Sequence, residues 1–252
     1  MQLVLLTALG VGGATFFGAL IGFFVKRIPH RFNDAILGFA AGVMLAAAII
    51  GLILPSLDYS GAHGVWVTVP GMLTGALFLN LIDRFVPHLH SIVGNDREHH
   101  PDSVKQLNKV LLFVGAIAIH NLPEGIAAGV CFGTENISDA LTVAGGIALQ
   151  NIPEGMVIIA PMLAAGISRR KTLRIALSTG VVEVIGTLFG FFAVNVASFI
   201  LPFALAFAGG TMLYVVSDEM IPETHAHGYE RSATYSLLFG FCLMLVMNFY
   251  MG

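Results

Sequence analysis

Long apolar stretches separated by short polar segments run through the whole chain. Because about 20 apolar residues cross the hydrocarbon core of a bilayer as a helix, each stretch predicts a transmembrane span. The predicted spans are residues 3–25, 34–57, 65–86, 108–132, 138–166, 173–198, 202–222 and 233–251. The pattern therefore predicts an all-α fold, a polytopic membrane bundle of eight transmembrane helices.

The composition strengthens this prediction. Apolar residues make up 56% of the 252 residues and charged residues only 11%, whereas a soluble domain carries about 25% charged residues. Since no polar linker divides the chain, we expect a single transmembrane domain over residues 1–252. Its two cysteines, Cys131 and Cys242, lie in separate apolar runs, which indicates neither a disulfide framework nor a thiolate metal cluster. No nucleic-acid partner is expected.

The basic residues orient the predicted bundle. All 12 Lys and Arg residues fall at or between the ends of spans one and two, three and four, five and six, or seven and eight. With eight spans they lie on one face of the membrane, which the positive-inside rule makes cytoplasmic. We therefore expect a multi-pass protein of the cell (inner) membrane with both termini outside the cytoplasm.

Two similar motifs lie in the middle of the fourth and fifth apolar runs. They read His-Asn-Leu-Pro-Glu-Gly at 120–125 and Gln-Asn-Ile-Pro-Glu-Gly at 150–155. Helix residues four apart share a face, so His120 should point with Glu124, and Gln150 with Glu154. Carboxylates at bilayer depth usually face a partner, a cavity or an ion path.

A proline precedes each motif glutamate. Neither Pro123 nor Pro153 can donate a backbone hydrogen bond, so we expect both helices to kink there. A carbonyl freed at this depth is tolerated where it lines a polar cavity. Imidazole, carboxylate, carboxamide and free carbonyl groups should therefore converge, which is a ligand set for a divalent cation in the middle of the membrane.

A third acidic residue, Glu183, lies inside the sixth apolar run with no Lys or Arg near its depth. Three buried glutamates cannot all stay ionised unaided, so either they are protonated or a cation joins them. At mid-depth of the second span, the Met44 thioether is either packing or a soft metal ligand.

Two further groups of polar residues lie on the predicted cytoplasmic face. The loop at 87–107 contains His88, His90, His99 and His100, and is either a weak metal-collecting segment or simply solvated. At the end of the seventh span, an acidic strip with histidines is either a solvated helix end or an exit path for metal. The possible exit-path ligands are Glu219, Glu223, His225 and His227.

The paired motifs in consecutive helices, followed by a glutamate in the next span, resemble the ZIP family of divalent metal transporters, in particular its bacterial zinc-transporter and GufA-like branch. The resemblance covers essentially the whole chain. It implies a homodimeric secondary transporter that moves divalent ions toward the cytoplasm, with no catalytic cofactor. It also implies an inverted repeat of helices 1–3 and 6–8 around the proline-kinked helices 4 and 5. Mixed nitrogen and oxygen ligands suit Zn²⁺ first, but also Fe²⁺, Mn²⁺, Co²⁺ and Cd²⁺.

The resemblance also implies two adjoining metal sites. The first would consist of Met44, His120, Glu124, Gln150 and Glu154. The second would consist of Asn121, Asn151 and Glu183, and would share the two motif glutamates. This chain departs from the family at two positions, since many relatives have His in place of Gln150 and some have an acid in place of Asn151. These departures bear on metal affinity and metal choice.

Two other classes of protein compete with a transporter. An intramembrane metalloenzyme needs an open zinc position and a general base, but the His-Glu-x-x-His signature is absent and each motif helix offers at most one imidazole. A metal-sensing or purely structural membrane bundle is the other alternative. Metal uptake into sealed proteoliposomes supports only the transporter, and peptide cleavage in detergent supports only the enzyme.

Overall fold

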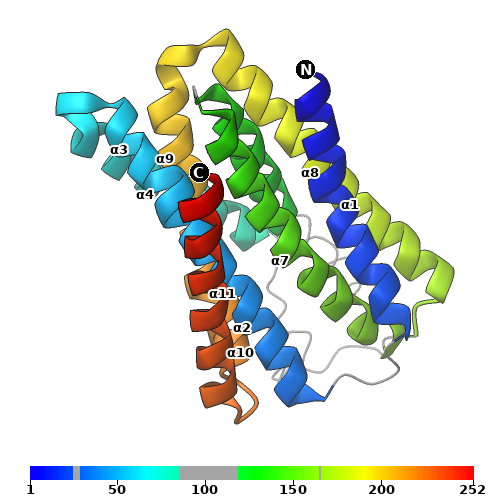
Figure 1. Ribbon diagram of the computed structural model, residues 1–252. Helices are drawn as coiled ribbons and strands as arrows, with labels where there is room; N and C mark the ends of the chain where they lie inside the picture. The colour runs from blue at the N-terminus through cyan, green and yellow to red at the C-terminus, as the bar shows by residue number, and fades with distance from the viewer. Residues whose placement is uncertain (25–28, 86–118, 135, 165) are drawn as a thin grey trace.

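The structure is a computed structural model that describes residues 1–24, 29–85, 119–134, 136–164 and 166–252. The histidines expected in the loop at 87–107 lie outside these residues. The described part of the chain is helical and contains no strand, which confirms the predicted all-α class. Its long helices (Figure 1) are α1 (Gln2–Phe24), α2 (His30–Ala46), α4 (Gly64–Phe85), α7 (Ile137–Ala164), α8 (Arg169–Val196), α9 (Leu201–Val215) and α11 (Glu230–Met251). Residues 119–130 form a further helix.

The prediction of a polytopic membrane protein is confirmed. Within the described residues, seven helical segments are long and apolar enough to cross a membrane. The span predicted at 108–132 is described only from residue 119, so the count of eight helices stays a prediction. Pro123 and Pro153 each lie inside a continuous helical segment, so neither proline ends its helix.

The second and seventh predicted spans are not uniform α-helices. After α2 the chain forms a π-helical segment, η1 (Ala47–Ile53), and then α3 (Leu54–Tyr59). After α9 it forms a second π-helical segment, η5 (Val216–Met220), and then α10 (Ile221–Thr224). Both spans therefore extend two residues beyond the ends predicted at residues 57 and 222.

A proline at the second residue of α3 and of α10 accounts for these wider turns. Pro55 and Pro222 lack the N–H that would bond the carbonyl four residues earlier, and that carbonyl lies inside the π segment in both cases. In η1 the carbonyl concerned belongs to Gly51, and the Cys131 thiol approaches it at 3.9 Å. Cys131 and Cys242 are both free, as the sequence predicts.

The helices pack in two groups. Helix α1 packs along α7 and α8 on one side of the bundle, while α2 packs along α11 and α4 along α9 on the other (Figure 1). Contacts of α2 and η1 with α7 join the two groups around a core that includes Leu52, Ile147 and Met212. The centre of the molecule is thus the place where α7 and the helix of residues 119–130 meet the other spans.

Glycines allow the closest helix contacts. A Cβ on Gly12 would overlap the carbonyl of Gly180, and a Cβ on Gly180 would overlap the carbonyl of Gly12, so α1 and α8 cross with their backbones touching. Gly18 lies against the backbone of Ile152 in α7 in the same way. These contacts require residues without a side chain, as expected for small residues in membrane helices.

Candidate metal centre

The structure places the residues of both predicted sites on four helical segments, where His120 and Glu154 are partly exposed and the others are buried. Glu183, Gln150 and Met44 are 0% exposed, and Glu124 is 1% exposed. The segments that carry them are α2 for Met44, residues 119–130 for His120, Asn121 and Glu124, α7 for Gln150, Asn151 and Glu154, and α8 for Glu183.

A hydrogen bond joins the two motifs directly. Gln150 Nε2 donates to Glu124 Oε1 at 2.9 Å, with both side chains buried. The i, i+4 spacing puts His120 with Glu124, and Gln150 with Glu154, on one face of each helix. The prediction that the two motif faces meet is therefore confirmed for this pair of residues.

A second group of hydrogen bonds surrounds Glu183. Asn151 Nδ2 donates to Glu183 Oε1 and, at 3.3 Å, to the backbone oxygen of Val11. The Thr15 hydroxyl donates to the other carboxylate oxygen, Glu183 Oε2, at 2.9 Å. The Glu183 carboxylate is thus held from α7 and from α1, and the latter contact was not predicted from the sequence.

Among the described residues, four buried oxygen atoms of the predicted ligands have no hydrogen-bond partner. They are Glu124 Oε2, Gln150 Oε1, Asn151 Oδ1 and Glu154 Oε1. Buried acceptors without partners are rare because each costs free energy comparable to a lost hydrogen bond. The side-chain amides of Gln150 and Asn151 each donate from the NH₂ group to a carboxylate, so the amide oxygen of each is left without a partner. The donor set fits a divalent cation, which accepts carboxylate and amide oxygens together.

The carboxylates are also close enough to act on one another. The carboxyl groups of Glu154 and Glu183 both lie within electrostatic range of Glu124. Glu154 is in turn close to the imidazole of His120. A cation among these side chains would offset the mutual repulsion of the carboxylates, whereas an apolar environment cannot.

His120 connects this centre to the seventh span. Its Nε2 atom lies 2.7 Å from Glu219 Oε2, in the π-helical segment η5. In the described part of the chain, no group of three His, Cys, Asp or Glu side chains is arranged to hold a metal ion by itself. The amide oxygens of Gln150 and Asn151 are further oxygen donors beside the carboxylates.

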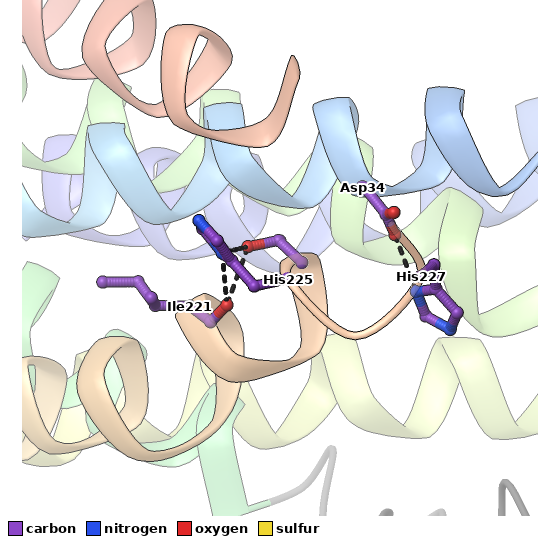
Figure 2. Close-up of polar contacts among 5 residues, drawn as sticks. Asp34, Ile221, His225 and His227 are labelled. Atoms are coloured by element: carbon purple, nitrogen blue, oxygen red, sulfur yellow. Dashed lines mark hydrogen bonds and ion pairs between the residues drawn. The ribbon is translucent and has the colours of Figure 1, made fainter. Parts of the chain in front are cut away.

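The residues predicted for an exit path take separate partners. His225 Nδ1 lies 2.8 Å from the Ile221 carbonyl and 3.0 Å from the Thr224 hydroxyl. His227 Nδ1 lies 3.0 Å from Asp34 Oδ1, and its ring stacks on that of His30 with centroids 4.7 Å apart. Figure 2 shows His225 turned toward its own helix turn and His227 turned toward Asp34.

In the described part of the chain, Glu219, His225 and His227 contact different neighbours and do not form one cluster, and their role in an exit path for metal stays a prediction. The chain changes direction after α10, so the two histidines point to different neighbours while Glu219 reaches back to His120. Each residue remains a single candidate ligand along a path from the centre to this end of the bundle.

Sequence reasoning missed Thr15, Asp34 and His30. Asp34 is fully buried near the start of α2, and only one of its carboxylate oxygens is hydrogen-bonded. An isolated acid at the start of an apolar run was the available signal for Asp34. For Thr15 the signal was the sequence similarity between the first and sixth spans. When the two spans are aligned, Thr15 is the counterpart of Glu183.

These observations define a class: a multi-pass helical membrane protein with a buried, oxygen-rich centre suited to a cation. Comparison with known proteins identifies the family. The family model described as "ZIP Zinc transporter" matches residues 90–248. The chain belongs to the ZIP family, and as a member it is a transporter of divalent metal ions and not an enzyme.

Individual relatives agree along nearly the whole chain. The chain is 38% identical to the zinc transporter GufA of Myxococcus xanthus, over 98% of each sequence. It is also 38% identical to the zinc transporter ZIPB of Bordetella bronchiseptica, over 95% of this chain and 78% of the relative. It is 30% identical to the human zinc transporter ZIP11, over 95% of this chain and 94% of the relative. The family resemblance inferred from the two motifs is thus confirmed, and the alternative of a metalloenzyme has no support.

Proposed function

We propose that this protein carries Zn²⁺, and with lower preference Fe²⁺, Mn²⁺, Co²⁺ and Cd²⁺, toward the cytoplasm through the centre formed by the two motif helices. The observation that carries the proposal is the set of four buried oxygens without hydrogen-bond partners, all on residues that the family pattern assigns to metal. The names of the relatives favour zinc as the main substrate.

The first site would use Met44, His120, Glu124, Gln150 and Glu154 as ligands. This mixture of sulfur, nitrogen and oxygen suits a borderline ion such as Zn²⁺ better than Mg²⁺ or Ca²⁺. The Gln150 NH₂ group fixes one oxygen of Glu124, which leaves the other carboxylate oxygen and the amide oxygen for the cation.

The second site would use Asn121, Asn151 and Glu183, together with the shared motif glutamates. Its arrangement repeats that of the first: an amide NH₂ holds a carboxylate while the amide oxygen stays available. Since an amide replaces the acid that some relatives have at this position, the second site holds less negative charge. We infer that it binds metal more weakly than the first and serves as a transit position.

The finer architecture that we propose is eight spans with an inverted repeat. Residues 8–24 (ALGVGGATFFGALIGFF) and 176–192 (ALSTGVVEVIGTLFGFF) are identical at eight of 17 positions, which are Ala8, Leu9, Gly12, Gly18, Leu20, Gly22, Phe23 and Phe24 in the first copy. A repeat of this kind should make α1 and α8 pack on opposite motif helices in the same way.

The glycine contacts of the two copies support this repeat. Gly18 lies against Ile152, and its counterpart Gly186 lies against Leu122; these two partners occupy the same position in the two motifs. Likewise Gly22 lies against Met156, and Gly190 against Ile126. The matched pairs favour a pseudo-twofold axis that exchanges α1 with α8 and the two motif helices with each other.

The other spans support the same axis. The second and seventh spans each contain a π-helical segment followed by a proline. An exchange of the second span with the seventh and of the third with the eighth would convert the α2–α11 pair into the α9–α4 pair, and both pairs are extensively packed. This grouping suits transport by movement of one helix group against the other.

The proposed orientation rests on the basic residues at helix starts. Helices α2, α11 and α8 all begin at the lower end of the bundle in Figure 1. Their first turns contain Arg31, Arg231 and residues 169–171, respectively. The helix macrodipole disfavours cations at these ends, so helix stability does not explain their placement. The positive-inside rule explains the placement of these basic residues, and it puts this end of the bundle in the cytoplasm and both termini outside. We also propose a homodimer in the cell membrane.

Metal uptake into sealed proteoliposomes tests the proposal. Purified protein should accumulate Zn²⁺ inside vesicles, and each of the other ions should compete at higher concentration. Glu124→Gln keeps the size of the side chain but removes its charge, and should transport at the background rate of empty vesicles. A wild type at that background rate, or a Glu124→Gln variant as active as the wild type, contradicts the proposed function.

A further inference from the structure

The hydroxyl of Thr15 makes an unusual contact for a threonine in an apolar helix. Such hydroxyls commonly bond to a carbonyl three or four residues earlier in their own helix. Thr179, Thr187 and Thr211 follow this rule, bonding to Ala176, Glu183 and Ala208 carbonyls at 2.9, 3.0 and 2.7 Å. Thr15 instead donates across the helix interface to the Glu183 carboxylate at 2.9 Å, with 1% and 0% of the two residues exposed.

The repeat between α1 and α8 gives this contact a meaning. Aligning residues 8–24 with 176–192 pairs Thr15 with Glu183 itself. The backbone contacts agree: Gly155 of the second motif lies against the carbonyl of Thr15, and Gly125 of the first motif lies against the carbonyl of Glu183. Thr15 therefore occupies the place where the other half of the molecule carries its acidic ligand.

We propose that Thr15 is a positioning residue of the second metal site, where its hydroxyl holds the Glu183 carboxylate in the orientation that receives the cation beside Asn151. The inference rests on the proposed function, because it takes Glu183 as a metal ligand. The hydroxyl donor occupies Oε2 and the Asn151 amide bonds to Oε1, so the carboxylate is fixed from two helices. A donor to a carboxylate stabilises its ionised form, which is the form that binds metal.

The substitution Thr15→Val tests this role, since it keeps the branched shape and removes the hydroxyl. Loss of a supporting partner typically costs about 10- to 100-fold in metal affinity, so we expect Zn²⁺ to bind to the detergent-solubilised protein at least about 10-fold more weakly, with a similar rise in the uptake KM. Thr15→Ser keeps the donor and should restore near wild-type values. Thr211→Val is the matched control, because that hydroxyl is equally buried and bonds only to its own helix.

A double-mutant cycle shows whether Thr15 acts through Glu183. Glu183→Gln alone should weaken binding, and Thr15→Val should add no further loss in that background. Additive losses, or a Thr15→Val variant with wild-type affinity, overturn the proposal. Thr15→Ala is a second variant in case valine packs poorly. Failure of both variants to fold while Thr211→Val folds makes the role structural and also overturns it.

The same experiment separates this inference from the proposed function. If Glu124→Gln transports normally, the central site is wrong and the assignment of Thr15 falls with it. If Glu124→Gln and Glu183→Gln both lose activity while Thr15→Val keeps wild-type affinity, the transport function stands and only the positioning role is refuted.

Discussion

At the scale of single residues, the two amides are the most informative part of the centre. Gln150 and Asn151 each give their nitrogen to a carboxylate and keep a buried oxygen without a partner. Buried acceptors without a partner are costly in an apolar interior, and a bound cation would satisfy both of these oxygens. The amides thus orient the carboxylates, and in the proposed sites they would also serve as neutral ligands that keep the negative charge of the centre moderate.

The motif glutamates should be indispensable for transport. Glu154→Ala removes a carboxylate whose Oε1 atom is buried and without a partner, and so removes charge that would replace the hydration of the ion. We expect Zn²⁺ uptake to fall by more than about 100-fold, beyond the usual cost of losing a supporting residue. Uptake and membrane insertion should be measured together, and normal uptake by an inserted Glu154→Ala variant contradicts this assignment.

Gln150 should influence metal choice. Gln150→His replaces an amide oxygen with an imidazole nitrogen, which Zn²⁺ prefers more strongly than Mn²⁺ does. The imidazole can still donate to Glu124, as the Gln150 amide now does. We expect the preference for Zn²⁺ over Mn²⁺ to rise several-fold in competition uptake assays. An unchanged ratio of the two ions would place Gln150 outside the coordination sphere.

At the scale of elements, the sequence predicts where helices lie better than how they are wound. Apolar runs predicted the spans because the bilayer sets their length, and the two motifs together predicted that their polar side chains converge, as the Gln150–Glu124 hydrogen bond now shows for one pair. The π-helical segments were not predicted, since apolar periodicity does not distinguish a π turn from an α turn. Pro55 and Pro222 were the relevant signal, because each lacks the backbone N–H that would bond a carbonyl inside the preceding π-helical segment. The Thr15 contact depends on a helix crossing that no local pattern encodes.

The proline after η5 should keep Glu219 in position. Pro222→Ala supplies an N–H for the carbonyl of Asp218 and so favours a regular α turn, which shifts Glu219 relative to His120. We expect uptake to slow several-fold while thermal stability stays the same or rises. Pro202→Ala is the control, because that proline lies in the first turn of α9, where its N–H is not needed. Equal uptake by the two variants contradicts this role of η5.

The repeat can be tested by exchanging its two unequal positions. Glu183→Thr should lose uptake, and adding Thr15→Glu should restore part of it, since the carboxylate then hangs from the equivalent position on α1 near the other motif helix. Thr15→Glu with Glu183 retained brings a fourth carboxylate into the centre and should bind Zn²⁺ only at higher pH. A double variant no better than Glu183→Thr alone argues against functional equivalence of the two halves.

At the scale of the whole molecule, the distribution of charge connects topology with the direction of transport. In the described part of the chain, Arg31, Arg231 and residues 169–171 lie at one end of the bundle, as do the histidines and acids that follow α9. His120, one helical turn before Glu124, lies 2.7 Å from Glu219 in η5, close to the end of the seventh span. In the proposed orientation, a cation that left the centre by this route would meet carboxylate and imidazole groups before the basic residues, which would suit release on the cytoplasmic side.

Thiol labelling in intact cells can test the orientation of the bundle. In a Cys242→Ser background, which removes the exposed native thiol, single cysteines are introduced at Ser198 between α8 and α9 and at Glu230 at the start of α11. Both positions are exposed and lie at opposite ends of the bundle according to the order of the spans. The positive-inside rule places Ser198 outside and Glu230 in the cytoplasm.

A membrane-impermeant reagent should therefore label Ser198→Cys in intact cells, and Glu230→Cys only after permeabilisation. The Cys242→Ser background should stay unlabelled because Cys131 is buried. The reverse labelling pattern would mean that the protein has the opposite orientation in the membrane. The predicted exit-path ligands after η5 would then lie at the entrance for metal instead of its exit.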